Sequence, residues 1–172
     1  MCFSLSLSSL AAILAATTVM VSAQNPLPTP QFEPLFAGEI TLTSGINTTS
    51  PFGTRVHYDV SGGNVTDART GERVATILAC ADDGIVSNSG IFFPEAVLPL
   101  VWDVDGHLAS IRVKGIGNLV LATHYAHVET DSPTYSWMNS NFFIIARNAT
   151  DPTHPVFTIF GISNSSSSSS GY

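Results

Sequence analysis

Residues 97–114 read VLPLVWDVDGHLASIRVK, and in this stretch two alternating runs flank Asp105-Gly106. Asp-Gly between alternating runs is a strong local signal for a β-hairpin with a two-residue type I′ turn. Such a turn places Trp102 opposite Ala109, and a large indole packs well against a small residue. We therefore predict that this face of the hairpin lies in the core. The face also carries Leu98, Leu100, Val104, His107, Ile111 and Val113.

The second face of the hairpin carries Arg112 between Ser110 and Lys114. A strand alternates its side chains between two faces, so parity alone allows two interpretations of this arginine. Arg112 is either a solvated surface charge or a single cation that points into a mixed cavity.

Period-two patterning extends over most of the chain, and only residues 11–21 have a helical pattern. About nine strands without helical crossovers predict an antiparallel β-barrel, with a β-sandwich as the alternative. We favour the barrel because several strands exceed nine residues and closure removes exposed edges. The predicted strands are 36–43, 55–60, 74–81, 85–89, 97–104, 107–114, 119–129, 135–147 and 156–162.

The two ends of the chain differ from this central domain. Residues 1–23 have an apolar centre and end in Val21-Ser22-Ala23, which predicts a cleaved secretory signal peptide and a secreted protein. Residues 24–33 form a proline-rich leader, 34–163 the predicted barrel, and 164–172 a serine-rich disordered tail.

Composition excludes several classes of partner. Six basic residues against thirteen acidic ones give a formal net charge of −7, which does not suit nucleic acid. No second apolar run approaches 20 residues, so we predict no membrane anchor. The composition gives no indication of how many copies of the chain associate.

Four Asn-x-Ser/Thr sequences are candidate glycosylation sites in a secreted protein, and we expect them at turns or in the tail. They are Asn47, Asn64, Asn148 and Asn164. Cys2 leaves with the signal peptide, so Cys80 has no intramolecular disulfide partner. Cys80 is a small buried hydrophobe, a free nucleophile or one half of an intermolecular disulfide.

Strand geometry argues against an obvious metal site. His124 and His127 are three residues apart and therefore point to opposite faces of a strand, so they cannot share a metal without a bulge. His57-x-Asp59 has the spacing of two ligands of a facial iron triad, which needs a further histidine. We predict no metal site, and a barrel enzyme that uses His57 and Asp59 is an alternative.

Large rings beside neutral polar groups occur in two of the predicted strands. Strand 119–129 carries His124 and Tyr125, and strand 135–147 carries Trp137 and Asn139. One interpretation is a packed core with a hydrogen-bonded histidine. The other is an apolar pocket with a few neutral donors, which is typical of small-molecule sites.

Short motifs carry a resemblance that covers roughly residues 34–162. They are Gly53-Thr54-Arg55, Gly62-Gly63, Thr70-Gly71-Glu72, Ala81-Asp82-Asp83-Gly84-Ile85-Val86, Phe92-Phe93-Pro94 and Tyr135-Ser136-Trp137. In these motifs the chain resembles small secreted fungal hetero-Diels–Alderases of tropolonic sesquiterpene pathways. A more distant likeness, in Pro34-Leu35-Phe36 and the Gly-Gly turn, is to a family of small β-barrel domains, and it supports the barrel.

The resemblance implies a secreted pericyclase that joins a quinone methide to a sesquiterpene alkene by a [4+2] cycloaddition. Such a reaction needs neither a metal nor a cofactor, and its partners are hydrophobic small molecules. We predict that Trp102, Tyr125 and Trp137 shape the pocket, and that His124, Asn139 or Arg112 donates a hydrogen bond to the substrate carbonyl. The alternatives are a lipocalin-like carrier and a structural protein of the cell surface.

Overall fold

The structure is a computed structural model and describes residues 29–162. The predicted signal peptide, the serine tail with Asn164, and the helical pattern at 11–21 lie outside the described residues. The elements are β1 (Phe32–Ser50), β2 (Gly53–Asp67), β3 (Arg73–Ile77), β4 (Cys80–Ser87), β5 (Phe92–Trp102), β6 (Leu108–Gly117), β7 (Leu121–Thr130), the 3-10 helix η2 (Ser136–Ser140), β8 (Phe143–Asn148) and β9 (Val156–Ile162).

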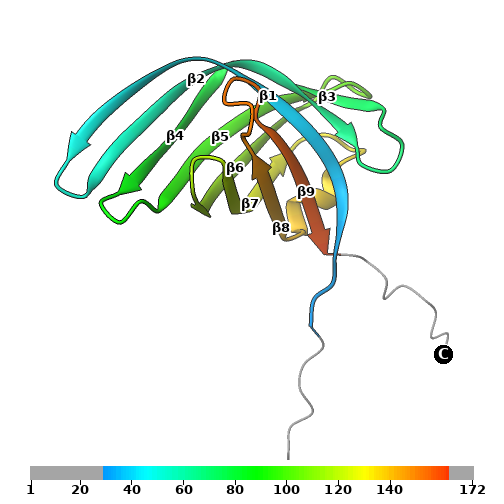
Figure 1. The fold of residues 1–172 in the computed structure, drawn as a ribbon. Helices are drawn as coiled ribbons and strands as arrows, with labels where there is room; N and C mark the ends of the chain where they lie inside the picture. Colours follow the sequence, from blue (N-terminus) through cyan, green and yellow to red (C-terminus); the bar gives the residue numbers. More distant parts are fainter. Residues whose placement is uncertain (1–28, 163–172) are drawn as a thin grey trace, which may run out of the picture.

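Strand β1 closes the sheet into a barrel. It pairs antiparallel with β2 along one edge and with β9 along the other, and β8, β7, β6 and β5 follow in order. Strands β3 and β4 share one position, because each pairs with a different part of β2 and of β5. The result is a closed antiparallel barrel of eight strand positions with one extra strand (Figure 1). The predicted fold class is confirmed.

Strict alternation in β5, β6 and β7 separates a buried face from an exposed one. Trp102 anchors the buried face: its ring stacks on Tyr135 at a centroid distance of 3.8 Å, and its Nε1 donates to Thr130 Oγ1 at 2.9 Å. This buried face joins residues from all parts of the barrel into one hydrophobic core. The predicted core face of the β5–β6 hairpin is therefore confirmed for Trp102 and its aliphatic neighbours.

The predicted register of that hairpin is wrong by two residues. Leu100 lies opposite Ala109, whereas a two-residue turn would place it opposite Ile111. The connection is longer because Trp102 N donates to His107 O and Gly106 N donates to Trp102 O. A shift of two residues preserves the faces. Val104 nevertheless leaves the core and is 61% exposed in the turn.

Two predicted strands are interrupted. The stretch 74–81 breaks after β3, where Leu78 N donates to Pro99 O, and the chain resumes as β4. The stretch 135–147 begins with η2 because side chains replace the strand ladder there: Asn139 accepts from Thr130 N and donates to Thr130 O. Strand β9 has its predicted bounds.

The candidate glycosylation sites also differ from expectation. Asn47 and Asn64 lie within strands β1 and β2, not in turns, while Asn148 ends β8. Asn47 and Asn148 are exposed and Asn64 is half-buried.

The barrel interior holds a small polar cluster. Asp82 Oδ2 lies 4.0 Å from Arg147 Nη2, and both side chains border a cavity of about 40 Å³ that His124 also lines. Burial raises the pKa of Asp82 and lowers the pKa of His124. The core therefore leaves room at this point for a few water molecules, not for a terpenoid.

Removing a core side chain should destabilise the barrel far more than removing its exposed neighbour across the hairpin. Leu100 is fully buried and Leu108 is 56% exposed. We expect Leu100→Ala to lower the free energy of unfolding by about 2–5 kcal/mol, and Leu108→Ala to change it by about 0.5 kcal/mol or less. Chemical denaturation measures both, and equal losses would contradict the assignment of the two faces.

Candidate functional site

A row of side chains crosses the sheet on the face opposite the core. Residues directly opposite each other on paired strands share a face. His57 pairs with Asp83, and Asp83 pairs with Glu95. The row continues through Lys114 and Tyr125, which are partners on β6 and β7. Five adjacent strands thus place one polar or aromatic side chain each in line.

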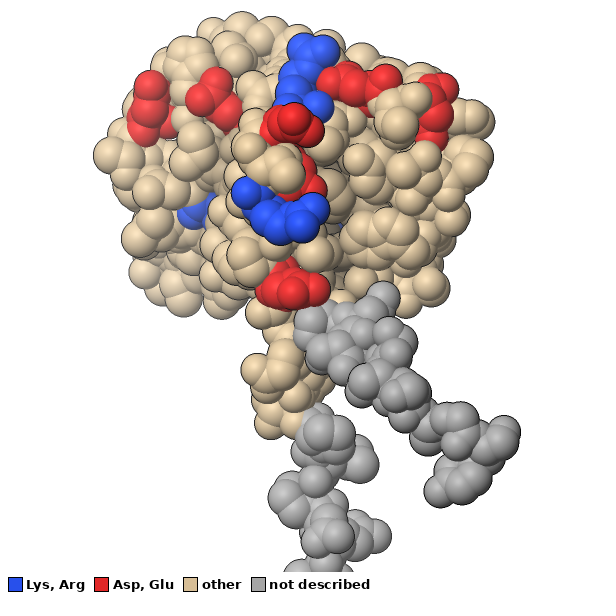
Figure 2. All heavy atoms as spheres, turned by 90° about the vertical axis from the view of Figure 1, so that its right-hand side faces the viewer, with Lys and Arg blue, Asp and Glu red and all other residues tan. Residues whose placement is uncertain are grey.

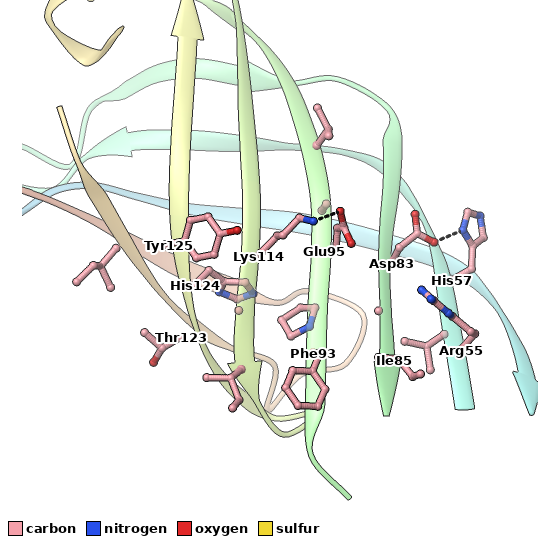
Figure 3. A pocket seen from close by; sticks show the side chains of 18 of the residues that line it. Arg55, His57, Asp83, Ile85, Phe93, Glu95, Lys114, Thr123, His124 and Tyr125 are labelled. Carbon is pink, nitrogen blue, oxygen red and sulfur yellow. Dashed lines mark hydrogen bonds and ion pairs between the residues drawn. The ribbon is translucent and has the colours of Figure 1, made fainter. Parts of the chain in front are cut away.

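This row lines an open pocket of about 1190 Å³ (Figure 3). Between and beside the row lie apolar side chains, many of them exposed. They are Ile46, Ile85, Phe93, Val97, Ile116, Phe142 and Ile144. A large, mainly apolar pocket with a few convergent polar groups is the usual make-up of a small-molecule site.

Two glycines whose Cβ positions face the core lie beneath the pocket. Gly84 and Gly115 both line it. A Cβ on Gly84 would lie 2.4 Å from the Phe92 ring, and one on Gly115 would lie 2.7 Å from the His124 ring. Both glycines are therefore required so that the larger rings can lie across them on the core side.

His57 is a titratable group of the pocket whose pKa is shifted by its neighbours. Its Nδ1 lies 2.6 Å from Asp83 Oδ1, and its Nε2 lies 3.6 Å from Asp59 Oδ1. The hydrogen bond with Asp83, followed by the charge of that carboxylate, raises the pKa of His57. Charge-assisted hydrogen bonds favour the protonated ring, so His57 keeps its positive charge to higher pH than an ordinary histidine.

Lys114 and Tyr125 supply further donors in the same pocket. Lys114 Nζ lies 2.8 Å from Glu95 Oε1, and this hydrogen bond is the main cause that raises the pKa of Lys114. Tyr125 lies opposite Lys114 on β7 and is exposed. Two proton donors are therefore adjacent on the pocket wall, with His57 further along the row (Figure 3).

The structure brings together only part of the predicted site. Tyr125 and His124 line the pocket. Trp102 lies in the core, and Asn139 bonds to the backbone of Thr130. The other two predicted residues lie outside the pocket lining: Arg112 is exposed on the face that carries Lys114, and Trp137 lies on η2 beside Phe143.

Sequence reasoning missed His57, Asp83, Glu95 and Lys114 as a group. These residues are far apart in the chain, and the strand register alone aligns them. The alternation in β5 and β6 predicts which residues share a face. It does not distinguish rings that line a pocket from rings that fill the core, where Trp102 and Phe143 lie.

The metal interpretation gains no support from the geometry. His124 is buried and His127 exposed, as the predicted alternation requires. His57 Nδ1 is engaged by Asp83. Within residues 29–162, no group of three or more His, Cys, Asp or Glu side chains has the arrangement of a metal site.

Cys80 is half-buried and packs against the core, with no disulfide partner among residues 29–162. Burial, together with the charge of Asp82, raises the pKa of its thiol to about 11. The thiol is therefore protonated at neutral pH, which makes it a poor nucleophile.

Known structures share this fold. A protein of unknown function from Clostridium acetobutylicum has 21% identity over 77% of this chain and 99% of its own, with a TM-score of 0.68. A β-barrel-like protein from Acinetobacter baumannii has 24% identity over 81% and 99%, with a TM-score of 0.68. An enzyme from Penicillium herquei has 17% identity over 78% and 98%, with a TM-score of 0.57.

These similarities show the fold, and one of the neighbours is an enzyme. In sequence, neither a protein family nor a curated protein matches the chain. Among residues 29–162, no helix has the length and apolar character needed to cross a membrane.

The two pocket histidines should titrate on opposite sides of the ordinary value of 6.5. We expect the pKa of His57 to lie above it because of Asp83, and the pKa of His124 to lie below it because of burial. Asp83→Asn should lower the His57 pKa and leave that of His124 in place. NMR titration of the ring protons measures both values, and a His57 pKa below 6.5 would contradict the hydrogen bond.

Proposed function

We propose that the protein is an enzyme that holds two neutral, apolar reactants in the open pocket and catalyses a hetero-Diels–Alder cycloaddition between them. The observation that carries this proposal is the pocket itself. Its volume of about 1190 Å³ exceeds the roughly 300–1,000 Å³ of ordinary single-ligand sites, and its lining is mainly apolar. A pocket of this size can hold a quinone methide and a sesquiterpene alkene side by side.

The reaction requires orientation above all. In a [4+2] closure the oxygen and the terminal carbon of the quinone methide bond to the two alkene carbons, and no atom or proton leaves. Well-oriented reactants can gain up to about 7–11 kcal/mol relative to reactants that meet in solution. The aliphatic side chains of Ile85, Val97 and Ile116, with the Phe93 ring, form walls for this purpose.

A hydrogen bond to the quinone methide carbonyl would stabilise the charge that develops on its oxygen. Lys114 and Tyr125 are adjacent donors on the pocket wall, and protonated His57 is a third. We assign the carbonyl contact to Lys114, with Tyr125 beside it. This assignment replaces Arg112 and Asn139, which do not line the pocket.

The protonation states suit an electrophilic substrate. Quinone methides react with amines and thiolates, so a neutral amine or thiolate near the pocket would consume them. Glu95 raises the pKa of Lys114, so this pocket amine stays protonated at neutral pH and does not compete with the alkene. Cys80 packs against the core and is not among the residues that line the pocket, and burial raises the pKa of its thiol to about 11.

Lys114→Met should slow adduct formation, and Arg112→Met supplies a matched control from the same face of β6. The assay uses an ortho-quinone methide generated in situ and a macrocyclic sesquiterpene alkene, with rate and enantiomeric excess measured by chiral chromatography. We expect Lys114→Met to lower the rate about tenfold or more, because a lost donor costs transition-state stabilisation. Arg112→Met should keep the wild-type rate.

Three outcomes would contradict the proposal or its assignment. A racemic adduct formed at the uncatalysed rate would exclude the enzyme. Saturable binding without acceleration would indicate a carrier. Equal rates for the two variants would remove Lys114 as the donor while leaving the reaction itself in place.

A further inference from the structure

Three hairpin tips lie side by side at one end of the barrel. They are the β1–β2 tip (50–53), the β4–β5 tip (87–92) and the β6–β7 tip (117–121). Asn88 Nδ2 donates to Pro51 O at 3.0 Å and joins the first two tips. Phe92 pairs with Gly117, which joins the second tip to the third. In Figure 1 the β1–β2 and β4–β5 tips point to the left.

The tips present large apolar side chains to solvent. Phe52 is 80% exposed at the end of the first hairpin. Burial of a phenylalanine side chain is favourable in free energy, so this exposure leaves stabilisation unused. The other exposed apolar side chains of these tips are Ile91, Leu119, Val120 and Leu121. Contiguous exposed apolar side chains of this kind mark an interaction surface.

Charge is absent from the same tips. None of the residues 50–53, 87–92 and 117–121 is Asp, Glu, Lys or Arg, although the whole chain has a net charge of −7. The nearest charged residue in sequence is Arg55, two positions beyond the first tip. The right-hand side of the molecule in Figure 1 is more highly charged than the tips: Figure 2 shows Asp, Glu, Lys and Arg side chains on it.

We propose that these three tips dock into the interface of a zwitterionic lipid bilayer. A bilayer interface accepts apolar side chains from several short loops at once. Its headgroups and water also form hydrogen bonds with the backbone groups of the tips.

Carboxylates would oppose insertion, and the three tips have none. The carboxylate of Asp151 lies in the separate β8–β9 connection, which meets the third tip where Ala149 N donates to Val120 O. Arg55 follows the first tip in the chain, and Arg147 Nη1 donates to Leu119 O in the third tip at 3.2 Å. Because the net charge of the chain is −7, anionic headgroups should add nothing to the affinity.

Docking in this orientation also places the pocket near the membrane surface. Phe93 and Ile116, which line the pocket, lie directly beside the second and third tips in the chain. An apolar ligand dissolved in the bilayer could therefore enter the pocket without crossing bulk water. The docking proposal stands independently of any reaction in the pocket.

The experiment measures vesicle binding by flotation of the purified protein with phosphatidylcholine vesicles. The test variant is Phe52→Ser with Val120→Ser. The matched control is Val104→Ser with Leu108→Ser, which removes two exposed apolar side chains near the β5–β6 turn at the other end of the barrel. We expect the test variant to lower the partition coefficient about tenfold or more, and the control to retain it. Circular dichroism verifies that both variants are folded.

Adding phosphatidylserine to the vesicles should leave wild-type binding unchanged or weaken it. The proposal is overturned if the wild-type protein binds no vesicle, or if both double variants lose binding equally. It is also overturned if the protein self-associates without lipid and the tip variant abolishes this association in sedimentation velocity. That result would assign the tips to an interface between copies of the chain.

Discussion

Unbroken alternation of side chains along β5, β6 and β7 determines both which residues fill the core and which residues line the pocket. These strands contain no bulge in their mutual pairing, so one face stays in the core along their whole length. Closure of the barrel through β1 then forces that face inward and fixes the other face outside the core. The row from His57 to Tyr125 exists because five strands keep the same phase. A one-residue slip in any of them would send its member of the row into the core.

The sequence predicted the barrel, the buried face of the β5–β6 hairpin and the bounds of β9, because each follows from local alternation. It did not predict η2, where Asn139 bonds to Thr130 and replaces the ladder. The pocket residues are harder to predict from the sequence than the strands are. Glu95 and Lys114 are 19 residues apart in the chain, and His57 and Asp83 are 26 apart. Their alignment depends on registers that no local pattern fixes, and the hairpin register itself was predicted two residues out.

The molecule separates its polar groups into two places with different chemistry. Inside the barrel, Asp82, Arg147 and His124 surround a small cavity, and burial shifts the pKa of each against its charged form. In the open pocket, His57 and Lys114 each lie beside a carboxylate that favours the charged form. Cationic donors among apolar walls suit a neutral ligand with a polarisable carbonyl. The uncharged hairpin tips nearby suit the medium in which such a ligand dissolves.

We propose that an apolar small molecule binds on the sheet face opposite the core. Backbone amide chemical shifts, followed during titration with a neutral terpenoid, test it most directly. We expect shift changes at Glu95, Lys114 and Tyr125, which line the pocket, and none at Leu100 and Ile111, which lie in the core. Changes that centre on Asp82 and Arg147 within the barrel, or no saturable change anywhere, would contradict it.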